Sequence, residues 1–196
     1  MFDLNKHDFT NLSYLQYGNG TQQRAYSILH SLNIMELLHS FNPILVGTIP
    51  IDIHVSSSDL DIICEVYDVE AFMQFTTSLF QNMDQYHYAV HTDSEQPYTV
   101  VNFQYENWEL EIFAQPIPTK RQNGYRHMIV EHRILQLLGS DGYRAIRELK
   151  ENGYKTEPAF AKLLQLEGDP YKRLLELEEW DEEQLSQFVM QSRSSN

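Results

Sequence analysis

The sequence predicts an α/β (α+β) fold in which a mixed, mainly antiparallel sheet with flanking helices precedes an all-helical lobe. Between residues 43 and 116, short runs rich in Val, Ile, Phe, Tyr and Trp alternate with turn residues, and one helical stretch interrupts them. After Pro118 the strand signals stop and helical spacing takes over. We therefore expect two domains, an α/β domain over residues 1–118 and a helical lobe over residues 119–196.

Local patterns predict the elements of the first domain. Apolar residues at helical spacing predict a helix over residues 21–41, with Thr21 as its N-cap, and a second helix over residues 69–83. The spacer IPIDIHVSSS is rich in β-forming residues and could form a short strand of its own. The predicted strands are ILVGT, DLDIICEV and a meander of YHYAVHT, YTVVNFQY and WELEIF.

Helix start and stop signals divide the last third of the chain. Thr119 and Gln122 form a capping-box pattern, which predicts a helix from there to about Leu138. The triplet Gly-Ser-Asp at 139–141 predicts a break. A second helix should follow to residues 152–153, and later helices should begin at Thr156, at Asp169-Pro170 and at Asp181.

The composition limits the partners and the location of the protein. Fourteen Lys and Arg stand against 28 Asp and Glu, a formal charge of −14. Because nucleic-acid affinity depends largely on neutralising phosphates, we expect no duplex-binding surface. No apolar run reaches the roughly 20 residues of a transmembrane helix, and the N-terminus lacks a signal-peptide pattern. We therefore expect a cytoplasmic protein that does not bind membranes.

Acidic residues recur with the period of a strand in two places. Asp59 and Asp61 are two apart, so their carboxylates should project from one face. Such a pair repels unless a cation lies between, and Mg²⁺ is often held by one or two carboxylates plus substrate phosphates. We expect Mg²⁺, with Mn²⁺ as an alternative. A third carboxylate should come from WELEIF, where we favour Glu111; Glu109 stays open as a ligand, a general base or a solvated residue.

A glycine and a hydroxyl residue end the first strand. Gly47 lets the backbone approach a phosphate closely, and Thr48 adds a hydroxyl donor. A phosphate cradle beside a metal pair is what phosphoryl or nucleotidyl transfer requires. Positive charge should come from the helix near Thr119, with Arg126 as a phosphate ligand. For Arg126, pairing with an acidic residue is an equal alternative.

These motifs resemble the nucleotidyltransferase superfamily with a polymerase-β-type core, with Gly-Thr in place of the commoner Gly-Ser. Over most of the chain, VGTIPIDI…SDLDI, EIFAQPIPT and QNGYRHMIVEHRIL are similar to a bacterial family of unknown function, DUF4269. The resemblance implies a nucleotidyltransferase-like fold. It implies these site residues: Gly47, Thr48 and Ser58 on the nucleotide, Asp59 and Asp61 on Mg²⁺, and Glu111 completing the metal site.

The activity implied is Mg²⁺-dependent transfer of a nucleoside monophosphate from an NTP, ATP among the candidates, to a small-molecule or protein acceptor. Pyrophosphate would be released. The alternative is a non-catalytic module on the same fold that senses nucleotides or binds a partner, including a small helical protein as in toxin–antitoxin pairs; a homodimer is also open. The three carboxylates favour the enzyme, because a binding module need not retain them.

Overall fold

The computed structural model describes residues 8–92 and 96–194. The described chain forms two compact units. The α/β unit comprises residues 8–50 and 59–125, and the helical unit comprises residues 51–58 together with the chain from residue 126 onward. The expected division into domains at residue 118 stays a prediction, since a compact unit within the chain is not thereby shown to fold on its own.

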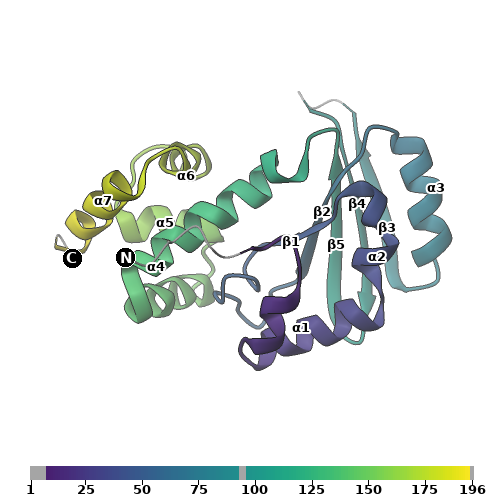
Figure 1. The fold of residues 1–196 in the computed structure, drawn as a ribbon, viewed down its shortest axis with the longest axis horizontal. Helices are drawn as coiled ribbons and strands as arrows, with labels where there is room; N and C mark the ends of the chain where they lie inside the picture. The colour runs from purple at the N-terminus through teal and green to yellow at the C-terminus, as the bar shows by residue number, and fades with distance from the viewer. Residues whose placement is uncertain (1–7, 93–95, 195–196) are drawn as a thin grey trace. The chain divides into compact units, whose positions relative to one another are not determined.

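The α/β unit is built on a five-stranded sheet in the order β1-β2-β5-β4-β3 (Figure 1). The β2–β5 pair is parallel and the other neighbouring pairs are antiparallel. The predicted mixed, mainly antiparallel sheet and its meander are therefore confirmed. The strands are β1 (Ile44–Val46), β2 (Leu60–Glu65), β3 (Asp84–His91), β4 (Tyr98–Tyr105) and β5 (Trp108–Gln115).

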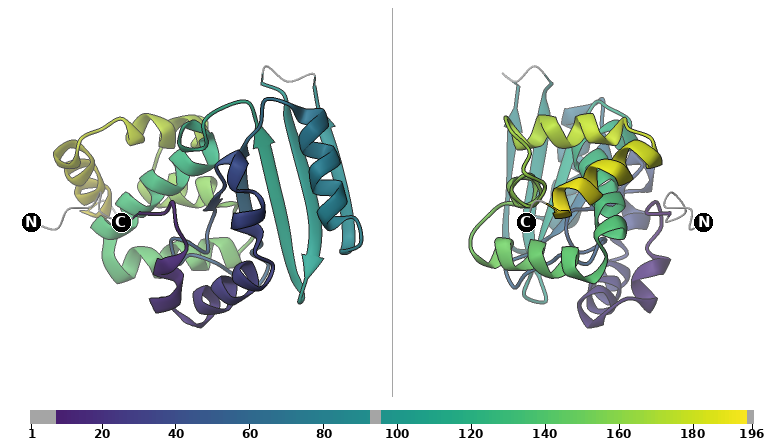
Figure 2. Two further views of the ribbon diagram at one scale, coloured as in Figure 1. Left: turned by 45° about the vertical axis from the view of Figure 1, so that its right-hand side comes forward. Right: turned by 90° about the vertical axis from the view of Figure 1, so that its left-hand side faces the viewer.

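Three helices cover one face of this sheet, namely α1 (Gly20–Ser31), α2 (Ile34–Leu37) and α3 (Val69–Phe80) (Figures 1 and 2). Alternate residues of the strands point into the core beneath them, so their neighbours project from the opposite face. This alternation puts acidic residues of β2 and β5 on the face away from the three helices. The strand residues of the core are Leu45, Leu60, Ile62, Cys64, Val101, Phe103, Leu110, Ile112 and Ala114.

The first helix begins and ends differently from the prediction. Its N-cap is Asn19, because the Asn19 side chain accepts from the Gln22 amide while the Gln22 side chain accepts from the Asn19 amide. Thr21 therefore lies inside the helix. The predicted single helix over residues 21–41 is broken at Asn33, whose φ of 51° is left-handed, and a short 3₁₀ turn at His39–Phe41 follows α2. Asparagine tolerates this conformation better than most residues.

The spacer between β1 and β2 contains turns and no strand, so its suggested β structure is wrong. The Gln22 side chain, on α1, donates to the carbonyls of Ile49 and Pro50 at 2.9 and 3.2 Å. Gln22 is 7% exposed. Specific side-chain bonds thus fix the start of the spacer, and its β-forming residues serve burial instead of sheet pairing.

The helix expected from Thr119 starts later. Thr119–Arg121 is a 3₁₀ turn, and α4 runs from Asn123 to Glu151. The predicted capping box is absent because the Gln122 side chain points into the α/β unit, where it donates to the carbonyls of Cys64 and Ile117 at 2.8 Å each. A buried amide thereby joins the end of β2 to the loop after β5.

The remaining helix signals are confirmed within the helical unit. The chain kinks at Gly139, where φ is 65° and ψ is −159°. Asp169 caps its helix by accepting from the Tyr171 amide, and Asp181 and Gln184 form reciprocal capping bonds of 2.8 and 3.2 Å. No helix of the described residues is both long and apolar enough to cross a membrane. The helices after α4 are α5 (Thr156–Leu164), α6 (Pro170–Glu178) and α7 (Glu182–Ser194).

Residues 51–58 are held within the helical unit by an arginine of α4. The Arg147 guanidinium lies 2.7 Å from the Asp52 carboxylate and also donates to the Asp52 carbonyl. The same guanidinium lies over the Tyr143 ring, 5.8 Å from its centroid. Asp52 adopts a left-handed φ of 58°. A charge pair and a cation–π contact therefore act together on this short segment.

A carboxyl group is buried in the helical unit. Glu131 is 3% exposed, and its Oε1 has no hydrogen-bond partner among the residues described. Burial raises the pKa of Glu131 well above its usual value; the Glu157 charge adds to this increase and Lys150 opposes it. The folded state therefore favours the neutral carboxyl group.

We expect Gln122→Met to lower the free energy of unfolding by about 1–3 kcal/mol, because two buried carbonyls lose their donor. Urea unfolding followed by circular dichroism measures the change. Gln74→Met, at an exposed position of α3, is the matched control. An equal effect of the two substitutions would contradict the role given to Gln122.

We expect Glu131→Gln to flatten the dependence of stability on pH. With a raised pKa in the folded state, Glu131 binds a proton more tightly when folded, so stability falls as pH rises from about 4.3 toward the folded pKa. The slope is at most about 1.4 kcal/mol per pH unit for one proton. Urea unfolding at several pH values should show that the free energy of unfolding of the variant rises relative to that of the wild type as pH rises. Glu148→Gln, exposed on the same helix, is the control, and parallel wild-type and Glu131→Gln curves would refute the assignment.

Candidate active site

One row of residues crosses four adjacent strands on the face away from α1–α3. Val46 of β1 pairs with Asp61 of β2, Asp61 pairs with Glu111 of β5, and Glu111 pairs with Asn102 of β4. Directly paired residues of neighbouring strands project to the same side of the sheet, and neighbouring strands lie about 4.7–4.9 Å apart. The sheet register therefore sets the carboxylates of Asp61 and Glu111 next to each other.

The turn after β1 lies against this row. Gly47 has a φ of +82°, a conformation that residues with a Cβ rarely adopt. A Cβ atom at this position would lie 2.4 Å from Oδ2 of Asp61. Two separate reasons therefore require a glycine at position 47: the backbone conformation and the close approach of the Asp61 carboxylate. The polypeptide backbone after β1 and the Asp61 carboxylate consequently form one compact feature.

Asp59 is the third acidic residue, and its charge affects Glu111. Burial raises the pKa of Glu111, and the negative charge of Asp59 raises it further. Neither Asp59 nor Glu111 forms an ion pair with a lysine or arginine of residues 8–92 or 96–194. Negative charge therefore accumulates at the β1 turn and the start of β2 without a basic side chain paired to these two carboxylates.

Glu109 has a different environment from Glu111. Glu109 pairs with Gln104 across the β4–β5 hairpin and accepts a long hydrogen bond of 3.4 Å from its side chain. It is exposed, whereas Glu111 is half-buried beside Asp61. Of the two glutamates left open by the sequence, the register pairs Glu111 with Asp61.

The donor set suits a hard divalent cation. All three acidic side chains offer carboxylate oxygens, which Mg²⁺ prefers, and the close approach at Gly47 leaves Asp61 pressed against backbone. Among the described residues, no three His, Cys, Asp or Glu side chains are arranged closely enough to hold a metal ion by themselves. The three-carboxylate metal site therefore stays a prediction.

Two predicted nucleotide-binding residues flank the carboxylates along the chain. Thr48 follows Gly47 directly and is half-buried. Ser58 precedes Asp59 but belongs to the segment 51–58, where its hydroxyl accepts from the Val55 amide and its own amide donates to the Val55 carbonyl. Ser58 thus closes a turn, and its contact with a nucleotide stays a prediction.

Arg126, which was expected to face the phosphates, and Arg133 on the same helix are both engaged inside the helical unit. Arg126 binds the Glu178 carboxylate through Nε at 2.6 Å and Nη2 at 2.5 Å. Arg133 donates to the carbonyls of Glu178 and Trp180 at 2.9 and 2.7 Å. The alternative of pairing with an acid is thus realised for Arg126, and its role on phosphate stays a prediction.

Asn102 is a candidate site residue that the sequence argument did not name. It lies beside Glu111 on the same face of the sheet. The signal was available, because Glu106 and Asn107 form the two-residue turn between β4 and β5, and both have positive φ. Two-residue turns of this kind fix hairpin register. Counting back from the turn pairs Asn102 with Glu111, and its amide can offer an oxygen ligand or a donor.

The fold is similar to that of solved nucleotidyltransferases. A structure of the Cid1 poly(U) polymerase with Mg 3'-dATP bound has a TM-score of 0.51 at 12% identity, covering 85% of this chain and 52% of that chain. The MgGTP-bound structure of the same polymerase has a TM-score of 0.50 at 11% identity, covering 78% of this chain and 47% of that one. The chain thus spans about half the length of these structures, and at such identity the likeness shows the fold alone.

The predicted nucleotidyltransferase-like fold is therefore confirmed. No curated protein matches the chain. The family model described as "Domain of unknown function (DUF4269)" matches residues 27–177, which is more than half of the sequence and includes every candidate site residue named above. The predicted resemblance is thereby also confirmed, and the chain belongs to the DUF4269 family.

Proposed function

We propose that the protein is a nucleotidyltransferase that moves a nucleoside monophosphate from an NTP to a small-molecule or protein acceptor, with release of pyrophosphate. The observation that carries the proposal is the pairing of Asp61 with Glu111 across β2 and β5, beside the turn at Gly47. The fold shared with a poly(U) polymerase supports the same class of reaction.

In this proposal Asp59, Asp61 and Glu111 hold Mg²⁺. The bound ion would supply positive charge for the triphosphate and the departing pyrophosphate. Backbone N–H groups of the turn at Gly47 and the Thr48 hydroxyl donate to a phosphate, since the Asp61 carboxylate already takes the space beside the Gly47 Cα. Asn102 orients the Glu111 carboxylate or a substrate hydroxyl from the neighbouring strand.

The acceptor hydroxyl forms a new bond to the α-phosphorus as the bond from that phosphorus to the pyrophosphate oxygen breaks. Glu111 accepts the proton that the hydroxyl loses. In the metal-free protein, burial and the Asp59 charge raise the pKa of Glu111.

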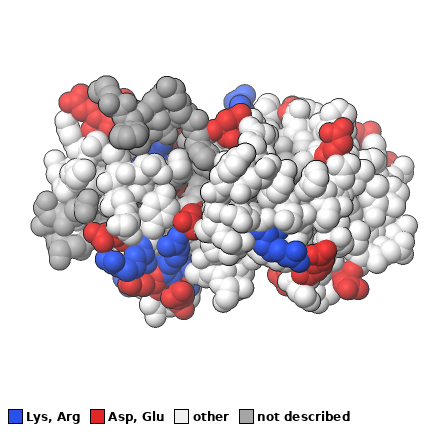
Figure 3. Space-filling view, turned by 60° about the horizontal axis from the view of Figure 1, so that its bottom comes forward, with Lys and Arg blue, Asp and Glu red and all other residues white. Residues whose placement is uncertain are grey.

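The charge distribution favours a small acceptor over a duplex. The formal charge is −14. On the face shown in Figure 3, Lys and Arg side chains lie beside Asp and Glu, and the described residues form no broad basic area there. Because duplex binding depends on neutralising many phosphates, such a face offers little affinity. A small molecule or a protein hydroxyl meets no such requirement.

We expect Glu111→Gln to reduce nucleotidyl transfer by about 100-fold or more, since it removes the proposed base and a proposed ligand while keeping the side-chain shape. Asp61→Asn should do the same. The measurement is pyrophosphate release, together with incorporation of label from each of the four NTPs, radiolabelled at the α-phosphate, into small molecules and proteins of a cell extract with Mg²⁺ present.

Glu109→Gln is the matched control, because it changes a glutamate two residues away on the same face. It should keep activity within about threefold. Equal transfer by the wild type and Glu111→Gln would contradict the proposed enzymatic activity. Nucleotide binding without turnover in both proteins would support the non-catalytic module. Incorporation of the label into RNA alone would mean that the acceptor is RNA and not a small molecule or a protein.

We expect Glu111→Gln to raise the thermal stability of the metal-free protein, because it removes a half-buried charge that Asp59 repels. Mg²⁺ should then stabilise the wild type more than the variant. At a Mg²⁺ concentration about ten times Kd, the gain for the wild type is about 1.4 kcal/mol. Thermal unfolding with EDTA and with Mg²⁺ measures both effects. Equal stabilisation of both proteins by Mg²⁺ would remove Glu111 from the metal site.

A further inference from the structure

A cavity lies in the α/β unit at the outer edge of the sheet. Its volume is about 670 Å³, within the range of roughly 300–1,000 Å³ that small-molecule sites occupy. The walls come from the segment before η1 (Ser13–Tyr17), from α2 and the chain leading into β1, from the end of β2, and from the 3₁₀ turn at Thr119. Leu12, Met35 and Ile44 give it an apolar lining.

The end of β2 contributes an oriented carboxylate to this cavity. Glu65 accepts from the Asn42 side chain at 3.1 Å on one oxygen and from the Tyr67 hydroxyl at 2.9 Å on the other. Both donors are neutral. Glu65 forms no ion pair with a lysine or arginine in the described parts of the chain. The carboxylate is thus fixed in direction by neutral donors, and the guanidinium of Arg121 acts electrostatically on Tyr67 without pairing with Glu65.

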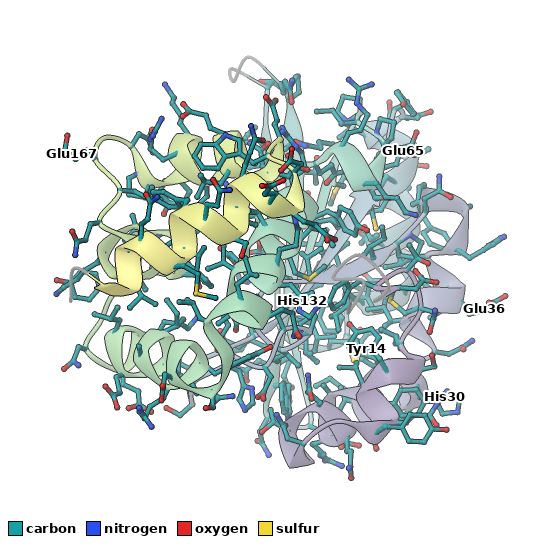
Figure 4. The ribbon with its side chains drawn as sticks, turned by 60° about the vertical axis from the view of Figure 1, so that its left-hand side comes forward. Tyr14, His30, Glu36, Glu65, His132 and Glu167 are labelled. Atoms are coloured by element: carbon teal, nitrogen blue, oxygen red, sulfur yellow. The ribbon has the colours of Figure 1, made fainter. Side chains whose placement is uncertain are left out.

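The titratable groups of the lining give an acidic balance. They are Glu36, Glu65, His39 and Lys120. Figure 4 labels Glu36 on α2 and Glu65 at the end of β2 and shows both on the same side of the α/β unit. The ammonium of Lys120 also acts on Asp8, whose pKa is lowered first by the Thr10 hydroxyl and more weakly by Lys120. The one lysine of the lining therefore has an acidic neighbour outside the cavity.

This cavity is separate from the candidate active site. Glu65 and Asp61 project to the same face of β2, four residues and so about 13 Å apart. Between them lies Ile63, and the first turn of α4 covers it, since a Cβ added at Gly124 would contact the side chains of Ile63 and Val46 at 3.6 Å. A molecule in the cavity would therefore leave the carboxylates of the active site free.

We propose that the cavity binds a small organic cation, a primary aliphatic amine whose ammonium pairs with Glu65 and whose hydrocarbon chain lies on Leu12, Met35 and Ile44. An ammonium group supplies the charge that Asn42 and Tyr67 do not. The apolar lining favours a ligand with a hydrocarbon chain, because burial of hydrocarbon is favourable by about 0.8 kcal/mol per CH₂ group. The inference does not depend on nucleotidyl transfer.

Hexylammonium is the probe for a direct test, with hexanol and hexanoate as ligands of the same chain length and different charge. Each is titrated into the ¹⁵N-labelled full chain, and amide shifts give the dissociation constant. Hexylammonium should shift residues 10–12, 35 and 119–120 and bind at least about fivefold more tightly than hexanol. Equal binding of hexanol, tighter binding of hexanoate, or shifts outside the lining would overturn the proposal.

Three variants separate charge recognition from packing. Glu65→Gln should weaken hexylammonium about tenfold, as expected for loss of one charge-assisted bond. Lys120→Ala should leave the affinity equal or higher, because it removes a like charge. Glu70→Gln, exposed on α3 and outside the lining, is the control and should change nothing. Weaker binding by Lys120→Ala with unchanged binding by Glu65→Gln would mean an anionic ligand and refute the amine.

Met35→Lys gives an independent result if Glu65→Gln disturbs folding. It retains Glu65 and introduces an ammonium group of the protein itself beside the cavity, so hexylammonium binding should be lost. Retained binding in a folded Met35→Lys protein, judged by dispersion of the amide spectrum, would contradict the proposed site.

Discussion

Two carboxylates held side by side by strand register are the constraint around which the α/β unit is organised. Asp61 and Glu111 belong to the parallel pair β2–β5, and neither can turn away without shifting a whole strand. Partial burial of the Glu111 charge and its repulsion by Asp59 oppose folding, and the hydrophobic face beneath offsets this cost, because Leu60, Ile62, Leu110 and Ile112 lie in the core. The same alternation that buries these residues exposes the acids on the other face.

The turn at Gly47 shows how closely sequence and site are connected. A side chain there would collide with the Asp61 carboxylate, so the glycine is a requirement of the acid as much as of the turn. The chain that follows is then fixed by Gln22, whose amide reaches two carbonyls of the spacer from α1. Catalytic groups need such supports, since small displacements reduce rates strongly.

Sequence patterns predicted most of the elements because their signals are local. Strand alternation, the glycine kink at Gly139 and the caps at Asp169 and Asp181 depend on neighbouring residues. The failures involve partners distant in sequence. Gln122 has the spacing of a capping residue, yet its amide is taken by Cys64, 58 positions earlier. The sequence favoured Glu111 but left Glu109 open for the same reason, because the choice depends on a parallel strand contact that no short window contains.

The segment 51–58 ties the two units together through the covalent chain. The polypeptide leaves the α/β unit after Pro50, is bound by Arg147 at Asp52, and returns at Asp59. A gene shortened at the end of the α/β unit would delete this arginine while retaining the loop that depends on it. The stretch joining Thr48 to Asp59 would then lose its anchor, so the smaller fragment is not a minimal version of this protein.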